Sequence, residues 1–499
     1  MSIKKLASHT IYYGLSSIAA KFINYLLTPY LTNNDAVSIG DYGKMTAMYA
    51  IIPIINIIFT YGMETAYFKF IQNEATSEKV NSTTSISIIV STTILTAAGW
   101  FMASPIATIA SLQGFENWVQ ISLLIIALDA LSAIPFARLR NEGRPLLFAF
   151  IRIASILLNV GLTLFFLSYC PKQVAAHPNS WYILVYNPAV NPVTYILIAN
   201  LAQSAFTFLL LSKWLLPKQW HFDIALWQKM IAYALPMLLA GMGGMINETF
   251  DRLMLGWWLP AGSDFDAQRG IYGACYKLSL LITLFIQAFR MGAEPFFFKQ
   301  AQGTNPQIIY ARVMKFFVIT LCFIFLGVTL YMPILKYFIG QKYWAGLGIV
   351  PLLLLANMAL GIYYNLSVWY KVTSNTMAGA YITLAGVAIT FAVNYLFIPS
   401  YGYVACAWAT FLCYTCMMII SFLWGQKHYF IPYKWKKLLA YIVIVLLLFG
   451  IQSIFSAFIA NVSIQLLIAT LLFATFTWFI ALVERKELKQ LPLVGRFIR

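Results

Sequence analysis

Long apolar stretches, separated by short polar breaks, recur along the whole of this 499-residue sequence. A helix needs about 20 apolar residues to cross the hydrocarbon core of a bilayer. Hydrophobic residues make up 61% of the chain and charged residues only 10%, whereas a soluble domain carries about 25% charged residues. The sequence therefore predicts an all-α polytopic membrane protein with about fourteen transmembrane helices. The expected spans are 9–31, 44–63, 85–107, 117–136, 146–168, 193–215, 228–250, 271–292, 310–335, 345–366, 376–397, 402–424, 437–459 and 463–483.

Basic residues are concentrated in every second break between these spans. The loops on the side of the N-terminus hold clusters such as Arg138, Arg140 and Arg144, and both ends of the chain are basic. Since Lys and Arg accumulate in cytoplasmic loops, both termini are expected in the cytoplasm. This pattern also accounts for the net charge of +17, and no zinc-ligand spacing or RNA-binding signature indicates nucleic-acid binding. The few cations expected in the outer loops are Lys172, Arg252, Arg269, Lys336 and Lys342.

An internal repeat relates the second span to the eighth. Residues 41–70 and 271–300 align without a gap and share eight identical residues, which include Gly62 with Gly292 and Glu64 with Glu294. The offset of 230 residues makes spans 1–6 and 7–12 two halves that insert the same way up, with a central cleft between them. The alternative is that such entry and exit signals recur because every helix needs ends. The expected units are a six-helix bundle at 1–216, a second at 217–427, and two extra helices with a basic cytoplasmic tail at 428–499.

Several charged residues fall within the expected spans, where an ionisable side chain is costly and indicates function. Cations that face a cleft would suit a diphosphate, because Lys and Arg donate charge-assisted hydrogen bonds to phosphate oxygens. Two alternatives stay open: Lys44 and Arg290 lie near interfaces and can snorkel, and Arg252 can pair locally with Glu248. The predicted substrate-binding residues are Lys21, Asn24, Lys44, Arg152, Arg252, Lys277 and Arg290.

Three carboxylates in or beside the spans are candidates for coupling transport to a proton or sodium ion. They are Asp129 in span 4, and Glu248 and Asp251 at the end of span 7. The alternative interpretation of Asp129 is an acidic residue that pairs with a neighbouring group and has a structural role. Transport without any coupling ion is also left open.

The residue patterns of common enzymes are absent from the sequence. All four histidines lie in loops or near the N-terminus, and no metal-binding spacing or phosphate-binding glycine loop occurs. Cys413 and Cys416 form a C-x-x-C within an apolar helix, where small packing residues are the simpler interpretation. We therefore expect no catalysis, metal site or cofactor.

Several motifs together resemble one transporter family. They are the basic start, Asp41-Tyr42-Gly43 before span 2, Tyr61-Gly62-Met63-Glu64 with Phe68-Lys69-Phe70 after it, the break from Arg138 to Pro145, and the plan of six, six and two spans. The chain resembles the polysaccharide-transporter branch of the multidrug/oligosaccharidyl-lipid/polysaccharide (MOP) superfamily, the Wzx-type flippases.

The resemblance implies a flippase that works by alternating access in a bacterial inner membrane. Its substrate would be an undecaprenyl-diphosphate-linked oligosaccharide for O-antigen, capsule or exopolysaccharide. Its partners would be membrane lipids and polysaccharide assembly proteins, around a monomeric transporter. Lys21, Arg152 and Lys277 would supply the cationic cavity of related lipid flippases.

Two other functions compete with this interpretation. A multidrug and organic cation antiporter of the MATE type shares the superfamily, although such transporters usually have twelve spans and acidic or aromatic cavities. A membrane glycan polymerase or ligase is the less favoured alternative. Those enzymes carry a long external loop with essential Arg or His residues, and the longest outer loop here, 169–192, holds only Lys172 and His177 of the basic types.

Overall fold

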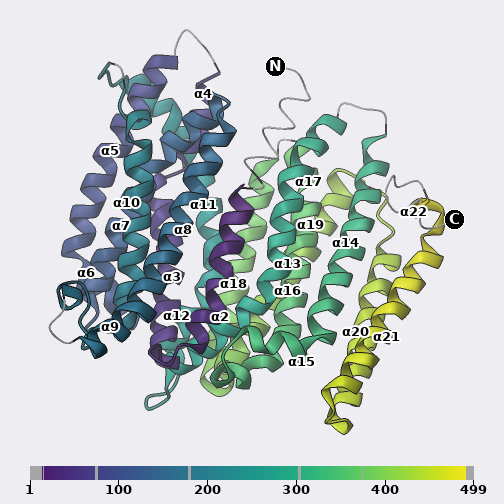
Figure 1. Cartoon of the computed structure of the whole chain (residues 1–499). Helices are drawn as coiled ribbons and strands as arrows, with labels where there is room; N and C mark the ends of the chain where they lie inside the picture. The colour runs from purple at the N-terminus through teal and green to yellow at the C-terminus, as the bar shows by residue number, and fades with distance from the viewer. Residues whose placement is uncertain are drawn as a thin grey trace.

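The computed structural model describes residue 14 and residues 16–72, 77–177, 181–217, 219–301, 305–373 and 375–489. Within these ranges the chain is a bundle of long helices that run in nearly the same direction, and no residue forms a strand (Figure 1). Twelve helices of the described part are long and apolar enough to cross a membrane. They correspond to the expected spans 2–6 and 8–14, so the predicted all-α polytopic fold is confirmed.

Most helices of the first part of the chain lie in the left-hand group of Figure 1, whereas α2 lies in the middle of the bundle. Residues 16–25 are helical and belong to the expected first span, whose beginning lies outside the described residues. The elements that follow are α2 (Leu27–Asn33), α3 (Ile39–Thr60), α4 (Met63–Phe70), α5 (Ser77–Phe101), α6 (Ala103–Ile109), α7 (Glu116–Asn141), α8 (Pro145–Leu164), the π-helical turn η2 (Phe165–Tyr169), α9 (Cys170–Ala176), the 3-10 turn η3 (Trp181–Leu184) and α10 (Pro192–Leu215).

The second part continues with α11, which corresponds to the expected seventh span. Its elements are α11 (Ile224–Thr249), α12 (Asp251–Trp258), α13 (Phe265–Gln300), α14 (Pro306–Leu330), α15 (Met332–Leu335), the 3-10 turns η4 (Lys336–Phe338) and η5 (Gln341–Ile349), α16 (Val350–Leu366), α17 (Val368–Val372), α18 (Thr376–Tyr401) and α19 (Tyr403–His428). The last elements are α20 (Trp435–Phe458), α21 (Val462–Val483) and α22 (Arg485–Leu488).

The two helices related by the repeat, α3 and α13, pack against each other. Their contact is made backbone to backbone at glycines. A Cβ atom added at Gly43 would lie 1.8 Å from the carbonyl oxygen of Asp266, and one at Gly270 would lie 2.2 Å from that of Ile39. Gly273, the repeat equivalent of Gly43, lies against the side chain of Thr46, where an added Cβ atom would be 2.6 Å from the hydroxyl oxygen. The equivalent helices therefore meet where only glycine leaves enough room.

We expect Gly43→Ala to destabilise the protein by about 1–3 kcal/mol, because the added methyl group forces these two backbones apart. The thermal unfolding midpoint of the purified protein in detergent measures this cost. Gly40→Ala is the matched control one turn earlier, since a Cβ there meets no atom closer than 3.8 Å. Equal midpoints for the two variants would contradict the close contact.

The first helix of each half packs on the other half. The beginning of α11, the end that is expected to face the cytoplasm, lies against the first bundle. There, Trp227 Nε1 donates a hydrogen bond to Ser87 Oγ at 2.8 Å. In the same way, Lys21 on the first helix donates to Gln287 Oε1 of α13 at 2.7 Å. The division between the two bundles at residues 216 and 217 stays a prediction. These contacts show that the first helix of each bundle packs against the other bundle.

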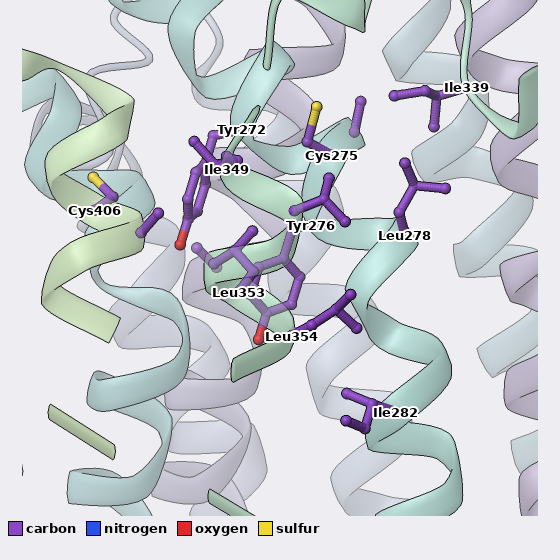
Figure 2. Close-up of a cluster of buried hydrophobic side chains, with 14 of the residues drawn as sticks. Tyr272, Cys275, Tyr276, Leu278, Ile282, Ile339, Ile349, Leu353, Leu354 and Cys406 are labelled. Carbon is purple, nitrogen blue, oxygen red and sulfur yellow. The ribbon is translucent and has the colours of Figure 1, made fainter. Parts of the chain in front are cut away.

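A core of buried apolar side chains fixes the rotation of α13. Figure 2 shows Leu278 and Ile282 of this helix among the buried residues that include Leu353 and Leu354 of α16. Because a residue advances by about 100° around a helix, Gly273, Lys277 and Leu280 lie on a neighbouring face of α13. Tyr276 lies between that face and the core, and all four residues line the cavity described below.

The last two long helices, α20 and α21, stand at the edge of the bundle beside α14 (Figure 1). They are held at one end by buried charges. Glu484 accepts hydrogen bonds from Lys315 at 2.7 Å and from Lys437 at 2.6 Å, and a third from the Tyr441 hydroxyl. The side chains of Lys315 and Glu484 are only 8% and 3% exposed. This cluster ties the two extra helices to α14.

Candidate substrate site

A cavity of about 390 Å³ lies between the two halves of the bundle. The helix at 16–25 and helices α2, α3, α8 and α10 form one wall, and α11, α12 and α13 form the other. Four of the predicted site residues line it: Asn24, Glu248, Arg252 and Lys277. The other polar lining residues are Thr28, Tyr42, Thr46, Tyr49, Asn159, Asn200, Thr249 and Tyr276.

Arg252 is held in the cavity wall by buried partners. It forms an ion pair with Asp251 at 3.3 Å and donates to the backbone carbonyl of Glu248. Its guanidinium also lies 4.5 Å from the centre of the Tyr276 ring. Asp251 is itself buried and accepts a hydrogen bond from the Tyr272 hydroxyl. Asp251 therefore positions Arg252 and does not line the cavity, whereas Glu248 does.

Lys277 is the least satisfied cation of the cavity. Within the described residues its ammonium has no hydrogen bond or ion pair, and the charge that acts on it is that of Arg252. Two like charges in a membrane-embedded cavity repel each other and are costly to bury. An anion bound between Lys277 and Arg252 would remove both penalties.

Three more of the predicted cations gather near this cavity without lining it. The charges that act on Lys21 are those of Glu248, Arg152 and Arg290. Arg152 lies on α8 seven residues before Asn159, which is about 10 Å along the helix. Its guanidinium is 4.2 Å from the centre of the Phe136 ring. Arg290 similarly lies 4.0 Å from the centre of the Tyr364 ring. Each of the three has contacts of its own, and none of them lines the cavity.

Two predicted residues lie apart from the cavity. Lys44 lies over the Phe115 ring at 4.8 Å, and its charge acts on Asp266. Asp129 accepts a hydrogen bond from Ser204 Oγ at 2.8 Å and interacts electrostatically with Arg152. The structure thus gives Lys44 a different environment and gives Asp129 a local partner.

Sequence reasoning based on charge missed the uncharged polar residues of the cavity. Asn159 and Asn200 interrupt the apolar runs of spans 5 and 6, and this interruption is the signal that would have found them. A second case is Arg269, which the charge pattern assigned to an outer loop. That assignment is wrong: Arg269 is fully buried in α13 and donates to the carbonyl oxygen of Arg252 at 2.7 Å.

Room for Arg269 comes from Gly256 of α12, where an added Cβ would lie 2.0 Å from the guanidinium. The buried arginine therefore braces the segment that carries Arg252. Across the described part of the chain, no group of three or more His, Cys, Asp or Glu residues could hold a metal ion.

Comparison with known proteins identifies the family. Residues 6–301 match the family described as polysaccharide biosynthesis protein. No curated protein matches the chain.

Several solved structures share the fold. The inward-facing conformation of a multidrug resistance MATE family transporter of the MOP superfamily has a TM-score of 0.58 at 14% identity, over 86% of this chain and 94% of that one. The outward-facing conformation of such a transporter has a TM-score of 0.55 at 13% identity, over 85% and 95%. A MATE crystal structure in the straight conformation has a TM-score of 0.56 at 12% identity, over 85% and 95%. The family match covers more than half of the sequence, so this chain belongs to the polysaccharide biosynthesis protein family and has the fold of the MOP transporters.

Proposed function

We propose that this chain is a flippase for undecaprenyl-diphosphate-linked oligosaccharides, the precursors of O-antigen, capsule or exopolysaccharide. It would move them from the cytoplasmic to the periplasmic leaflet of a bacterial inner membrane, with both termini in the cytoplasm. The observation that carries the proposal is the ammonium of Lys277, which has no bonded partner in the described structure and faces a cavity beside Arg252. A diphosphate supplies oxygen acceptors for both cations.

The surrounding charges support an anionic substrate. The predicted site contains five cations in or beside the spans, Lys21, Arg152, Arg252, Lys277 and Arg290, against the three carboxylates Asp129, Glu248 and Asp251. One of these carboxylates, Asp251, is already paired with Arg252. The cavity volume of about 390 Å³ lies within the range of about 300–1,000 Å³ typical of ligand sites. Membership of the polysaccharide biosynthesis family points in the same direction.

Alternating access is the mechanism that two packed halves with a cavity between them can perform. The halves are in backbone contact at Gly43 and Gly270, so a relative rotation about this contact would expose the cavity to one side or the other. Glu248 or Asp129 could accept a coupling proton or sodium ion. The chain would act as a monomer in this scheme.

A MATE-type organic cation antiporter is the second candidate, favoured by the fold of the similar structures. In that case the Glu248 carboxylate in the cavity wall would bind the cationic substrate. The neighbouring charges of Arg252 and Lys21 act on Glu248 and oppose this role.

Reconstitution into liposomes distinguishes the two candidates. The protein is incorporated with a fluorescent undecaprenyl-diphosphate-linked oligosaccharide, and its transfer between leaflets is followed by a membrane-impermeant quencher. We expect transfer that exceeds that of protein-free liposomes. Transfer at the protein-free rate, together with proton-driven uptake of an organic cation, would contradict the proposal and support the antiporter.

A further inference from the structure

The polar groups of the central cavity are segregated between its two walls. All three charged lining residues, Glu248, Arg252 and Lys277, come from α11, α12 and α13. The opposite wall carries amides and hydroxyls with no formal charge, including Tyr49 of α3, Asn159 of α8 and Asn200 of α10. The two walls are therefore built for different chemistry.

Asn159 is the clearest sign that the uncharged wall awaits a ligand. The residue is 3% exposed, and its Oδ1 atom has no hydrogen-bond partner in the described part of the structure. A buried acceptor without a partner is destabilising, and native structures seldom retain one without a reason.

Asn200 and Tyr49 extend the same surface. The Asn200 amide group donates to the Tyr49 hydroxyl and to the carbonyl oxygen of Ile196, the latter at 3.1 Å. These bonds use its NH₂ group.

Neutral amides and phenolic hydroxyls are suited to sugar hydroxyl groups, which both donate and accept hydrogen bonds. They contribute little to binding a diphosphate, which needs cationic donors. The cavity thus offers the cations Arg252 and Lys277 for the diphosphate on one wall, and neutral side chains for the attached sugar on the other.

We propose that Asn159, Asn200 and Tyr49 form a sugar-recognition surface, which binds the sugar next to the diphosphate and sets the selectivity for the glycan. This inference rests on the proposed flippase function. It adds that one wall of the cavity binds the diphosphate and the other binds the sugar. Lys277 and Arg252 hold the part common to all lipid-linked glycans, and the neutral wall discriminates between them.

The test compares the binding of two lipids to the full-length protein in nanodiscs. One probe is undecaprenyl diphosphate without sugar, and the other is the same lipid carrying a disaccharide. We expect the wild type to bind the disaccharide lipid more tightly. The double variant Asn159→Leu/Asn200→Ala should lose about 10-fold or more of that affinity, from two hydrogen-bonding residues lost. Its affinity for the sugar-free lipid should stay that of the wild type.

Two further variants keep the test decisive. Asn159→Leu alone removes the unpartnered acceptor, so it should unfold at the same temperature as the wild type or higher while it loses sugar preference. A purely structural role would give the opposite result. Asn117→Ala, an exposed asparagine of α7 outside the cavity lining, is the matched control and should leave both affinities unchanged.

The unfavourable outcomes are distinguishable. If the wild type binds both lipids equally, or if the double variant keeps the preference for the disaccharide lipid, the sugar-recognition surface is refuted and the flippase proposal stands. If the wild type binds neither lipid, both proposals fail.

Discussion

Replacement of Lys277 by methionine is expected to remove most of the transport of lipid-linked oligosaccharide. A hydrogen bond to a charged group is worth about 1.5–3 kcal/mol, so substrate affinity should fall by about 10- to 150-fold. Methionine has a similar length and is apolar, and the cation that it replaces has no bonded partner in the described structure. The protein should therefore fold normally, and stability in detergent should not fall.

The measurement is leaflet transfer in liposomes, and Lys229→Met is the matched control. Lys229 is an exposed lysine of α11 outside the cavity lining, and its loss should leave transfer near the wild-type rate. Lys277→Arg should retain part of the activity, because the charge remains while its geometry changes. Full activity of Lys277→Met would remove the main support for an anionic headgroup in this cavity.

Replacement of Glu484 by glutamine is expected to release the two extra helices from α14. The carboxylate joins the buried Lys315 and the half-buried Lys437, and its removal leaves Glu487 as the remaining ion-pair partner of Lys315. Breaking a fully buried pair costs about 3–5 kcal/mol, and the contact with Glu487 reduces that cost here. Glutamine preserves the shape of the side chain, so the loss would come from charge.

Denaturation in detergent and proteolysis of the segment before α20 measure this effect. Glu142→Gln is the control, because Glu142 pairs with Arg144 at 2.9 Å in an exposed position. An exposed pair contributes about 0–1 kcal/mol. Equal losses in the two variants would show that the buried cluster does not hold the helices.

Acid should reproduce the Glu484→Gln effect in the wild type. Burial tends to raise the pKa of the Glu484 carboxyl, but hydrogen bonds from Lys315, Lys437 and Tyr441 outweigh it and hold the pKa below its usual range. A carboxyl with a lowered pKa in the folded state stabilises it above the unfolded pKa, which is about 4.3. This stabilisation is lost as the pH falls through the folded pKa. The wild type should loosen in acid, and Glu484→Gln should respond less.

Hydropathy was sufficient to predict the long helices, and the sequence repeat predicts that α3 and α13 are equivalent. Each helix in a membrane must satisfy its own backbone hydrogen bonds, so an apolar stretch of sufficient length has one available structure. The eight identities between residues 41–70 and 271–300 also anticipated glycines at equivalent places. That Gly43 and Gly273 both lie in the contact between these helices appears only in three dimensions.

The candidate site was predicted in part. Charge placed Arg252, Lys277 and Glu248 among the candidates, and all three line the cavity. Charge also selected Lys44, which lies over Phe115 instead, and missed Asn159 and Asn200. A search for charged residues cannot find the uncharged side chains that line the cavity. The position of a residue within a span also does not determine which way its side chain points.

The sequence by itself determined the membrane-spanning character of the chain, the order of its long helices and the family. These properties depend on local composition and on spacing along the chain, which a bilayer converts directly into helices. Only the tertiary structure decided which polar residues share the cavity. Glu248 and Asp251 are three residues apart, yet the first lines the cavity and the second is buried behind Arg252. Their separation sets the angle between them, but the rotation of each helix depends on how its glycines and its apolar core pack against helices distant in the sequence.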